Sequence, residues 1–224
     1  MPLPIAVILS GCGKMDGSEI QEAVSILIHL SKHGREFRCF APDAPQQDVV
    51  NHATNKAQPG HTRNMMVEAA RITRGEITPL EKLDPAQFSA AILPGGYGAA
   101  KNLCDFASKG HDCEVLPDIS RVLKAFHGAK KPVGLCCIAP VLAARVLGTR
   151  KDGPGVKVTI GTDEQTAEAI KTMGATHVPR SVAEAYTDEV NRVVTTPAYM
   201  FDARPHEVFE GIGKMVDAVV GMAK

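Results

Sequence analysis

The chain has 224 residues, and its 25 Lys and Arg residues balance 25 Asp and Glu residues, so the formal net charge is zero at neutral pH. This balance argues against a protein that binds nucleic acid or an anionic membrane through its charge. Hydrophobic residues make up 44% of the sequence and charged residues 22%, a composition typical of a globular domain and unlike that of a disordered chain. The length favours one large domain, 1–224, over two.

The ends of the chain and its cysteines bear on the compartment. The longest stretches without charge, 3–13 and 132–144, are shorter than the roughly 20 apolar residues of a membrane span and are broken by Gly and Pro. Residues 1–4 carry no basic region and no cleavage pattern, so no secretory signal is expected. The six cysteines lack paired CxxC spacing, which predicts reduced thiols and no metal site. We expect a cytoplasmic protein, or a mitochondrial one if a transit segment is missing from this chain.

Short apolar runs rich in Val and Ile alternate with helical patterns along the sequence. The runs, each bounded by Gly, Pro or Asp, are 5–9, 37–40, 90–93, 133–136, 156–160 and 192–195. The helical patterns are 18–32, 118–126, 139–146, 163–173 and 207–222, and the first carries Ile20, Ala23, Val24, Leu27 and Leu30 on its expected apolar face. Strands separated by helices predict a doubly wound, mostly parallel sheet covered by helices on both faces. The polar stretch 42–60 and a helix at 62–74 are expected to be an insertion, at about 43–75, between the second and third core strands.

Three of the predicted strands end in residues suited to chemistry. Ser-Gly-Cys-Gly follows the first strand at 10–13, Pro-Gly-Gly-Tyr-Gly follows the third at 94–98, and Cys-Cys-Ile-Ala-Pro ends the fourth at 136–140. Ligands of parallel sheets bind at the carboxyl ends of the strands, so we expect these segments to meet. Cys137 lies where the strand gives way to a helix, a position that exposes a nucleophile and lowers the pKa of a thiol. The alternative is a pair of buried apolar cysteines.

Backbone and carboxylate partners for Cys137 can be proposed from the same strand ends. The loop at 94–98 offers unobstructed N–H groups for an oxyanion hole, with Gly96 as the favoured donor, although its glycines could serve only to turn the chain. Glu19 and Glu22 lie on one face of the first helix and could reach the strand ends, but acidic residues in a first helical turn usually complement the helix dipole.

Other candidate sites are weaker. Gly11, Gly13 and Gly17 do not have the spacing of a dinucleotide fingerprint, for which Asp43 would be the ribose-binding residue. The eight histidines lie outside any motif.

The motifs at 94–103 and 134–140 resemble those of the class I glutamine amidotransferase-like superfamily, and more narrowly its ElbB branch, the enhancing-lycopene-biosynthesis proteins and their mitochondrial relatives. Further matches occur at 10–13, 16–20, 62–64, 68–72, 160–163 and 194–200, in order along nearly the whole chain. The resemblance implies a flavodoxin-like three-layer sandwich, a homodimer, and glyoxalase or deglycase activity on small reactive carbonyls.

The resemblance also assigns roles to residues. Cys137 takes the place of the nucleophile and Glu22 that of the glutamate on the first helix, with Gly96 and Ile138 N–H groups as the oxyanion hole. Cys12, Glu19 and Asn64 are possible auxiliary residues. Ile138 and Gly161 stand where many members of the superfamily have a histidine, so the resemblance does not extend to a Cys-His-acid triad.

The expected reaction uses a Cys137 thiolate, which adds to an aldehyde such as glyoxal and is assisted by Glu22, without metal or organic cofactor. Two alternatives stay open. One is a redox sensor or binding module in which Cys12 resolves an oxidised Cys137 as a disulfide. The other is an amidase subunit fed by a partner, which would need the missing histidine.

Overall fold

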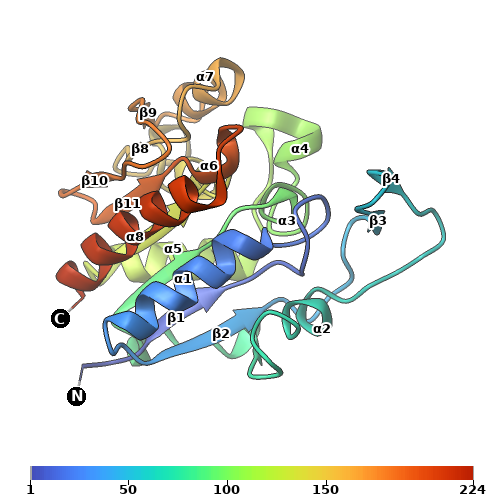
Figure 1. The fold of residues 1–224 in the computed structure, drawn as a ribbon. Helices are drawn as coiled ribbons and strands as arrows, with labels where there is room; N and C mark the ends of the chain where they lie inside the picture. Colours follow the sequence, from blue (N-terminus) through green and yellow to red (C-terminus); the bar gives the residue numbers. More distant parts are fainter. Residues whose placement is uncertain (1, 224) are drawn as a thin grey trace.

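The computed structural model describes residues 2–223 and has a seven-stranded sheet at its centre, in the order β10-β11-β7-β6-β1-β2-β5 (Figure 1). The strands are β1 (Ile5–Ile8), β2 (Phe37–Ala41), β5 (Thr78–Pro79), β6 (Ala90–Leu93), β7 (Val133–Cys136), β10 (Tyr186–Asp188) and β11 (Val193–Thr196). Every neighbouring pair is parallel except β10 and β11. The order β2-β1-β6-β7-β11 is the flavodoxin-like order of core strands, which confirms the predicted fold class.

Helices cover both faces of the sheet (Figure 1). On one face, α1 (Ile20–Lys32), α2 (Met65–Ala69) and α8 (Pro205–Met222) pack over a hydrophobic cluster that takes Ile5 and Val7 from β1. On the other, α3 (Tyr97–Lys101), α5 (Pro117–Gly128), α6 (Pro140–Leu147) and α7 (Glu164–Thr172) pack over a cluster that takes Ala6 and Ile8. Successive side chains of β1 therefore enter opposite layers, as expected for a strand buried on both faces.

The predicted strand at 156–160 does not join the central sheet. Only β8 (Lys157–Val158) is formed there, and it pairs with β9 (Thr176–His177) in a separate two-stranded sheet. The N–H groups of Lys157 and Thr159 donate to side chains beside the sheet, Asp188 Oδ2 at 2.7 Å and Thr195 Oγ1 at 2.9 Å. Side-chain acceptors thus replace the backbone ladder that would have extended the sheet.

The face of α1 that enters the core matches the predicted one at Ala23 and Leu30 but not at Ile20 and Val24. Ala23, Ile26 and Leu30 are fully buried, whereas Ile20 is 45% exposed and Val24 37% exposed. The buried residues follow the spacing of three to four that a core-facing helix requires, but so do the exposed ones, and the pattern alone did not separate the two faces.

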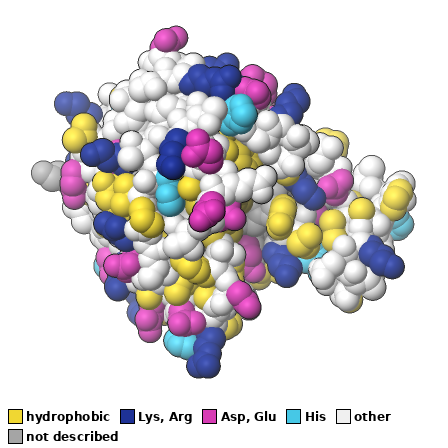
Figure 2. Space-filling view, turned by 90° about the horizontal axis from the view of Figure 1, so that it is seen from above, with side chains coloured by type: hydrophobic (Ala, Val, Ile, Leu, Met, Phe, Trp, Pro, Cys, Tyr) yellow, Lys and Arg dark blue, Asp and Glu magenta, His cyan; other side chains and the backbone are white. Residues whose placement is uncertain are grey.

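The segment between β2 and β5 forms an arm that projects from the body (Figures 1 and 2). It carries the hairpin β3 (Val50–Asn51) and β4 (Lys56–Ala57), and then α2, which has five residues where the sequence predicted a helix over 62–74. After α2 the chain enters a turn, with positive φ at Arg74 and Gly75, that ends the helical stretch.

Among the described residues, no helix is long and apolar enough to cross a membrane.

Candidate active site

Cys137 stands at a sharp turn between β7 and α6. β7 ends at Cys136, and Cys137 has a φ of +58°, a left-handed conformation that side-chain-bearing residues adopt only under constraint. Its N–H donates to the Thr196 carbonyl of the neighbouring strand at 3.0 Å, which holds the strained turn in place. The side chain is 7% exposed and lines a cavity of about 1540 Å³ at the carboxyl ends of the strands.

Glu22 reaches the same place from the first turn of α1. Its side chain is fully buried, and three groups donate to its carboxyl oxygens. Gly95 N–H donates to Oε2 at 2.9 Å, the Cys136 thiol contacts Oε2 at 3.6 Å, and Tyr199 N–H donates to Oε1 at 3.3 Å. The Cys137 thiol lies near the same carboxyl, and the two groups shift each other's pKa. Glu22 therefore bridges the two adjacent cysteines and the loop after β6.

Gly95 and Gly96 make this close approach possible. A Cβ atom on Gly95 would lie 2.4 Å from the Cys137 Cβ and 2.9 Å from Glu22 Oε2, so no larger residue fits. Gly96 has a φ of +87° and begins α3. Turning the chain is therefore not the only role of these glycines, since Gly95 gives Glu22 and Cys137 the space to meet and Gly96 lets the loop approach the backbone of Gly17 and Glu19.

Burial has the largest effect on the pKa values of Glu22 and Cys137. Removal from water, together with the charge of Glu19, raises the pKa of Glu22 to about 7. Burial and the Glu22 carboxylate raise the pKa of Cys137 well above its ordinary value. The prediction that the turn lowers the pKa of the Cys137 thiol is therefore wrong for the state in which Glu22 is ionised. Desolvation and the negative charge of Glu22 raise this pKa by more than the N-terminus of α6 can lower it.

Two backbone N–H groups face the Cys137 sulfur and favour its thiolate. They belong to Gly96 and Ile138, and their hydrogen bonds lower the pKa of Cys137 against the larger effects of burial and Glu22. A protonated Glu22 would add a third donor. The pair can therefore hold one proton in two ways, as carboxylate with thiol or as carboxylic acid with thiolate.

The cavity walls come from elements that lie far apart in the sequence. Besides Cys137, Gly96 and Ile138, the lining includes residues of the β1–α1 loop, of the segment 106–111, of α7 and of 199–205. Lys14, His111 and Tyr199 line the cavity and were not predicted from the sequence. His111 lies on a 3₁₀ turn with no motif around it, so only the tertiary fold could reveal it.

The auxiliary residues separate into two groups. Glu19 lines the cavity and caps α1, accepting from Glu22 N–H at 2.7 Å, and burial raises the pKa of its carboxyl. Cys12 and Asn64 are not among the lining residues. Asn64 caps α2 and donates to Asp43 Oδ1 at 2.7 Å, which explains both residues without a nucleotide.

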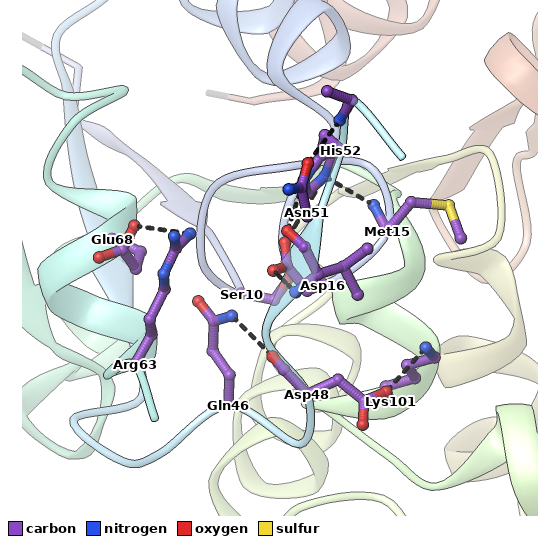
Figure 3. Close-up of polar contacts among 12 residues, drawn as sticks. Ser10, Met15, Asp16, Gln46, Asp48, Asn51, His52, Arg63, Glu68 and Lys101 are labelled. Atoms are coloured by element: carbon purple, nitrogen blue, oxygen red, sulfur yellow. Dashed lines mark hydrogen bonds and ion pairs between the residues drawn. The ribbon is translucent and has the colours of Figure 1, made fainter. Parts of the chain in front are cut away.

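Cys12 belongs to a polar region under the arm, part of which Figure 3 shows. The charged groups that act on its thiol are Glu68, Arg71, Asp16 and Arg63, and burial together with Glu68 raises its pKa. These charged neighbours lie outside the lining of the cavity. The structure therefore does not place Cys12 at the cavity with Cys137, as the resolving role would require.

The arm holds the β1–α1 loop from outside (Figure 3). Val50 N–H donates to Asp16 Oδ2 at 2.8 Å, and Met15 N–H donates to His52 Nε2 at 3.2 Å. From the other side, the Asn102 amide donates to the Ser10 and Asp16 carbonyls at 2.9 Å each. These contacts fix the loop that leads into α1 and so position Glu22.

No three His, Cys, Asp or Glu side chains within residues 2–223 are grouped so that they could hold a metal ion.

No family model matches the chain, but known proteins are similar to it over nearly its whole length. The glutamine amidotransferase-like class 1 domain-containing protein 3 of Homo sapiens is 51% identical, and the ES1 protein homolog of Rattus norvegicus is 50% identical. Each alignment covers 96% of this chain and 82% of the relative. Both relatives are named as mitochondrial, in agreement with the mitochondrial alternative for localisation.

Solved structures extend the similarity to three dimensions. The crystal structure of an isoprenoid biosynthesis protein with an amidotransferase-like domain from Ehrlichia chaffeensis matches with a TM-score of 0.91 at 40% identity. The match covers 99% of this chain and all of that one. Drosophila melanogaster DJ-1β, with a TM-score of 0.53 at 13% identity over 100% and 96% of the two chains, shares the fold alone.

Proposed function

The chain belongs to the family of ES1 and glutamine amidotransferase-like class 1 proteins, and we propose that it is a glyoxalase-like enzyme that converts small dicarbonyls into 2-hydroxy acids. One observation carries the proposal. A cysteine at a strained turn lies near a buried carboxyl whose pKa is about 7, and the cysteine lines a large cavity. Within the family, we propose that the chain belongs to the ElbB branch, which the motifs at 94–103 and 134–140 support.

The first step is nucleophilic addition. The Cys137 thiol passes its proton to the Glu22 carboxylate, and the thiolate attacks one aldehyde carbon of glyoxal. The carbonyl oxygen becomes an alkoxide that faces the N–H groups of Gly96 and Ile138, and takes the proton back from Glu22. The product is a hemithioacetal on Cys137, and Glu22 is again a carboxylate.

The second step moves a proton between the two carbons. Glu22 removes the hydrogen from the carbon bound to sulfur, giving an enediolate, and returns a proton to the neighbouring carbon. A carboxyl with a pKa of about 7 suits both directions near neutral pH, because neither form is strongly disfavoured. The result is a thioester of the 2-hydroxy acid, and water hydrolyses it to release glycolate and the free thiol.

The reaction distinguishes this proposal from its two rivals. The glyoxalase-like reaction uses no histidine, whereas an amidase subunit would need one. His111 lines the cavity and is the histidine that such an amidase would have to use. A sensor would have no use for a group that moves a proton between two carbons, whereas the buried Glu22 carboxyl with a pKa of about 7 suits that step. Turnover that survives His111→Ala would favour the glyoxalase-like reaction over the amidase.

The test is consumption of glyoxal and methylglyoxal by the purified protein, with the hydroxy acid quantified and no glutathione added. We expect glycolate and lactate from the native chain and none from Cys137→Ser, with circular dichroism showing that the variant is folded. No turnover above that of the variant, together with oxidation of Cys137 by sub-stoichiometric peroxide, would replace this proposal by the redox sensor.

We also propose that the protein is a homodimer, formed through the exposed apolar stripe of α1 made of Ile20, Val24 and Ile28. Glu19 lies at one end of this helix and Lys32 at the other. A second copy packed antiparallel about a two-fold axis would bury both stripes and bring opposite charges together. Sedimentation should show a dimer for the native chain and a monomer for Val24→Lys; equal masses would overturn this assignment.

A further inference from the structure

Residues 104–113 connect α3 to α5 and form one wall of the Cys137 cavity. They include α4 (Phe106–Lys109) and a 3₁₀ turn at Gly110–Asp112. Five of these residues line the cavity: Phe106, Ala107, Ser108, Gly110 and His111. The segment begins and ends with a cysteine, and the proposed function uses neither of the two.

The backbone brings the two cysteines together. Residues 103–105 run antiparallel to 114–116, with Cys104 opposite Val115 in an isolated β-bridge. Side chains two residues apart in a strand lie on the same side, so Cys113 is the diagonal neighbour of Cys104. The two thiols are close enough to shift each other's pKa, and the one proton of Cys104 can be donated either to Cys113 or to the Ala99 carbonyl, whose oxygen lies 3.3 Å from Cys104 Sγ.

The surroundings make the two thiols chemically different. Arg145 is buried, and its Nε donates to the Cys113 carbonyl. The hydrogen bond from Cys104 and the nearby guanidinium lower the pKa of Cys113, whereas the contact with Cys113 and burial raise the pKa of Cys104. Cys113 therefore has the thiolate character of an attacking group, and Cys104 keeps its proton as a resolving group would.

We propose that Cys104 and Cys113 are a dithiol–disulfide site, oxidised by peroxide, whose disulfide restrains the cavity wall between them. The Cys113 thiolate attacks one oxygen of hydrogen peroxide, the O–O bond breaks, and one molecule of water leaves with a proton taken from solvent. Cys104 sulfur then displaces hydroxide from the sulfenic acid, and the Cys104 proton completes a second water. Two thiols lose two electrons to one peroxide, and a small dithiol reverses the step.

A disulfide between Cys104 and Cys113 would restrain the cavity wall because it joins the two ends of the segment that forms it. Phe106 packs against the core, and Asp112 pairs with Arg150 at 3.0 Å. The stretch between them is held loosely: Lys109 pairs with Asp105, at 2.7 Å, and the side chains of Ala107, Ser108 and Lys109 are exposed. Such a segment opens more readily than the core, and transient opening also admits peroxide to the buried thiols. A disulfide closes the segment into a short ring and removes its open conformations.

The test maps cysteine oxidation and measures opening of the wall in the same samples. The native chain is treated with stoichiometric hydrogen peroxide, its free thiols are alkylated, and its peptides are analysed by mass spectrometry. We expect a Cys104–Cys113 disulfide that dithiothreitol reverses. Limited trypsin digestion then reports cleavage after Lys109, and since proteolysis follows the open population, we expect cleavage to be at least about five-fold slower in the oxidised protein.

Variants separate the disulfide from other oxidation. Cys104→Ser should lose the slowing of cleavage, whereas Cys39→Ser, which removes another buried thiol, should keep it. Two results would overturn the proposal: peroxide that oxidises Cys12 or Cys137 while Cys104 and Cys113 are recovered as alkylated thiols, or a disulfide that leaves cleavage after Lys109 unchanged. Neither readout depends on dicarbonyl turnover, so the result is independent of the proposed function.

Discussion

Two cysteines follow parallel strands at the same edge of the sheet, and their surroundings differ completely. Cys137, after β7, opens into a cavity of about 1540 Å³, whereas Cys12, after β1, lies under the arm among Glu68, Arg63 and Arg71. From the sequence, both were candidates because each follows directly on a predicted strand, Cys12 in Ser-Gly-Cys-Gly at 10–13 and Cys137 in Cys-Cys-Ile-Ala-Pro at 136–140. The comparison teaches that a motif at a strand end predicts proximity to the edge, and that the segment packed above it decides whether space for a substrate exists.

The largest expected effect tests this contrast directly. Cys137→Ser should lower dicarbonyl turnover by at least about a thousand-fold, because the nucleophile is lost. Cys12→Ser should leave turnover within about two-fold, because the thiol does not line the cavity. Steady-state assays of both variants provide the measurement, and a large loss in Cys12→Ser would show that the two regions act together.

Glu22 and Glu19 give a second matched pair. Glu22→Gln should reduce turnover about a hundred-fold or more, because an amide cannot transfer the proton between the substrate carbons. Glu19→Gln keeps an oxygen to cap α1 and should change the rate by less than about five-fold. Equal losses in the two variants would remove the distinction between a catalytic carboxyl and a capping one.

The raised pKa of Glu22 also predicts how stability changes with pH. The pKa is about 7 in the folded chain and 4.5 as its ordinary value, so the folded state binds the proton more tightly. The resulting stabilisation is complete below pH 4.5 and is lost as the pH rises through 7, a difference of about 3 kcal/mol. Urea unfolding at pH 5 and pH 8 should show this difference in the native chain and a smaller one in Glu22→Gln. An unchanged pH dependence in the variant would contradict the assignment.

The region under the arm yields the smallest effect. Asp16 Oδ1 is buried without a hydrogen-bond partner and lies 3.6 Å from His52 Nε2. Asp16→Asn keeps an acceptor for Val50 N–H and removes a buried charge of which one oxygen has no hydrogen-bond partner, so we expect stabilisation of up to about 1 kcal/mol. Asp16→Ala removes the acceptor and should destabilise the chain. Thermal melts would reveal the order of the three proteins, and destabilisation by Asn would refute this explanation of the contact.

The sequence predicted the parts of the fold that depend on local patterns. Buried apolar runs identified the five central parallel strands, and the turn after β7 was placed at Cys137. The arm hairpin and the antiparallel β10 were not predicted, because their strands have only two or three residues and show no alternating pattern. The separate pairing of β8 depends on side-chain acceptors from β10 and β11. The buried face of α1 was predicted only in part, since Ala23 and Leu30 are buried but Ile20 and Val24 are exposed.

The candidate site was predicted in its residues but not in its electrostatics. Strand ends and family motifs indicated Cys137, Glu22, Gly96 and Ile138. They could not show that Glu22 is fully buried between two cysteines, which reverses the expected direction of the thiol pKa. His111 could not be found either, since the fold brings it to the cavity from a segment without a motif.

The central claim is that Cys137 and Glu22 share one proton, and the rate of Cys137 alkylation as a function of pH tests it most directly. We expect the rate in the native chain to rise through a pKa of about 7 and then to level off, since the pair has lost one proton and the remaining one is shared. Glu19→Gln should keep an inflection but move it to lower pH, because the charge of Glu19 raises the pKa of Glu22, whereas Glu22→Gln should lose it. An inflection near 7 that persists in Glu22→Gln would contradict the shared proton and the mechanism built on it.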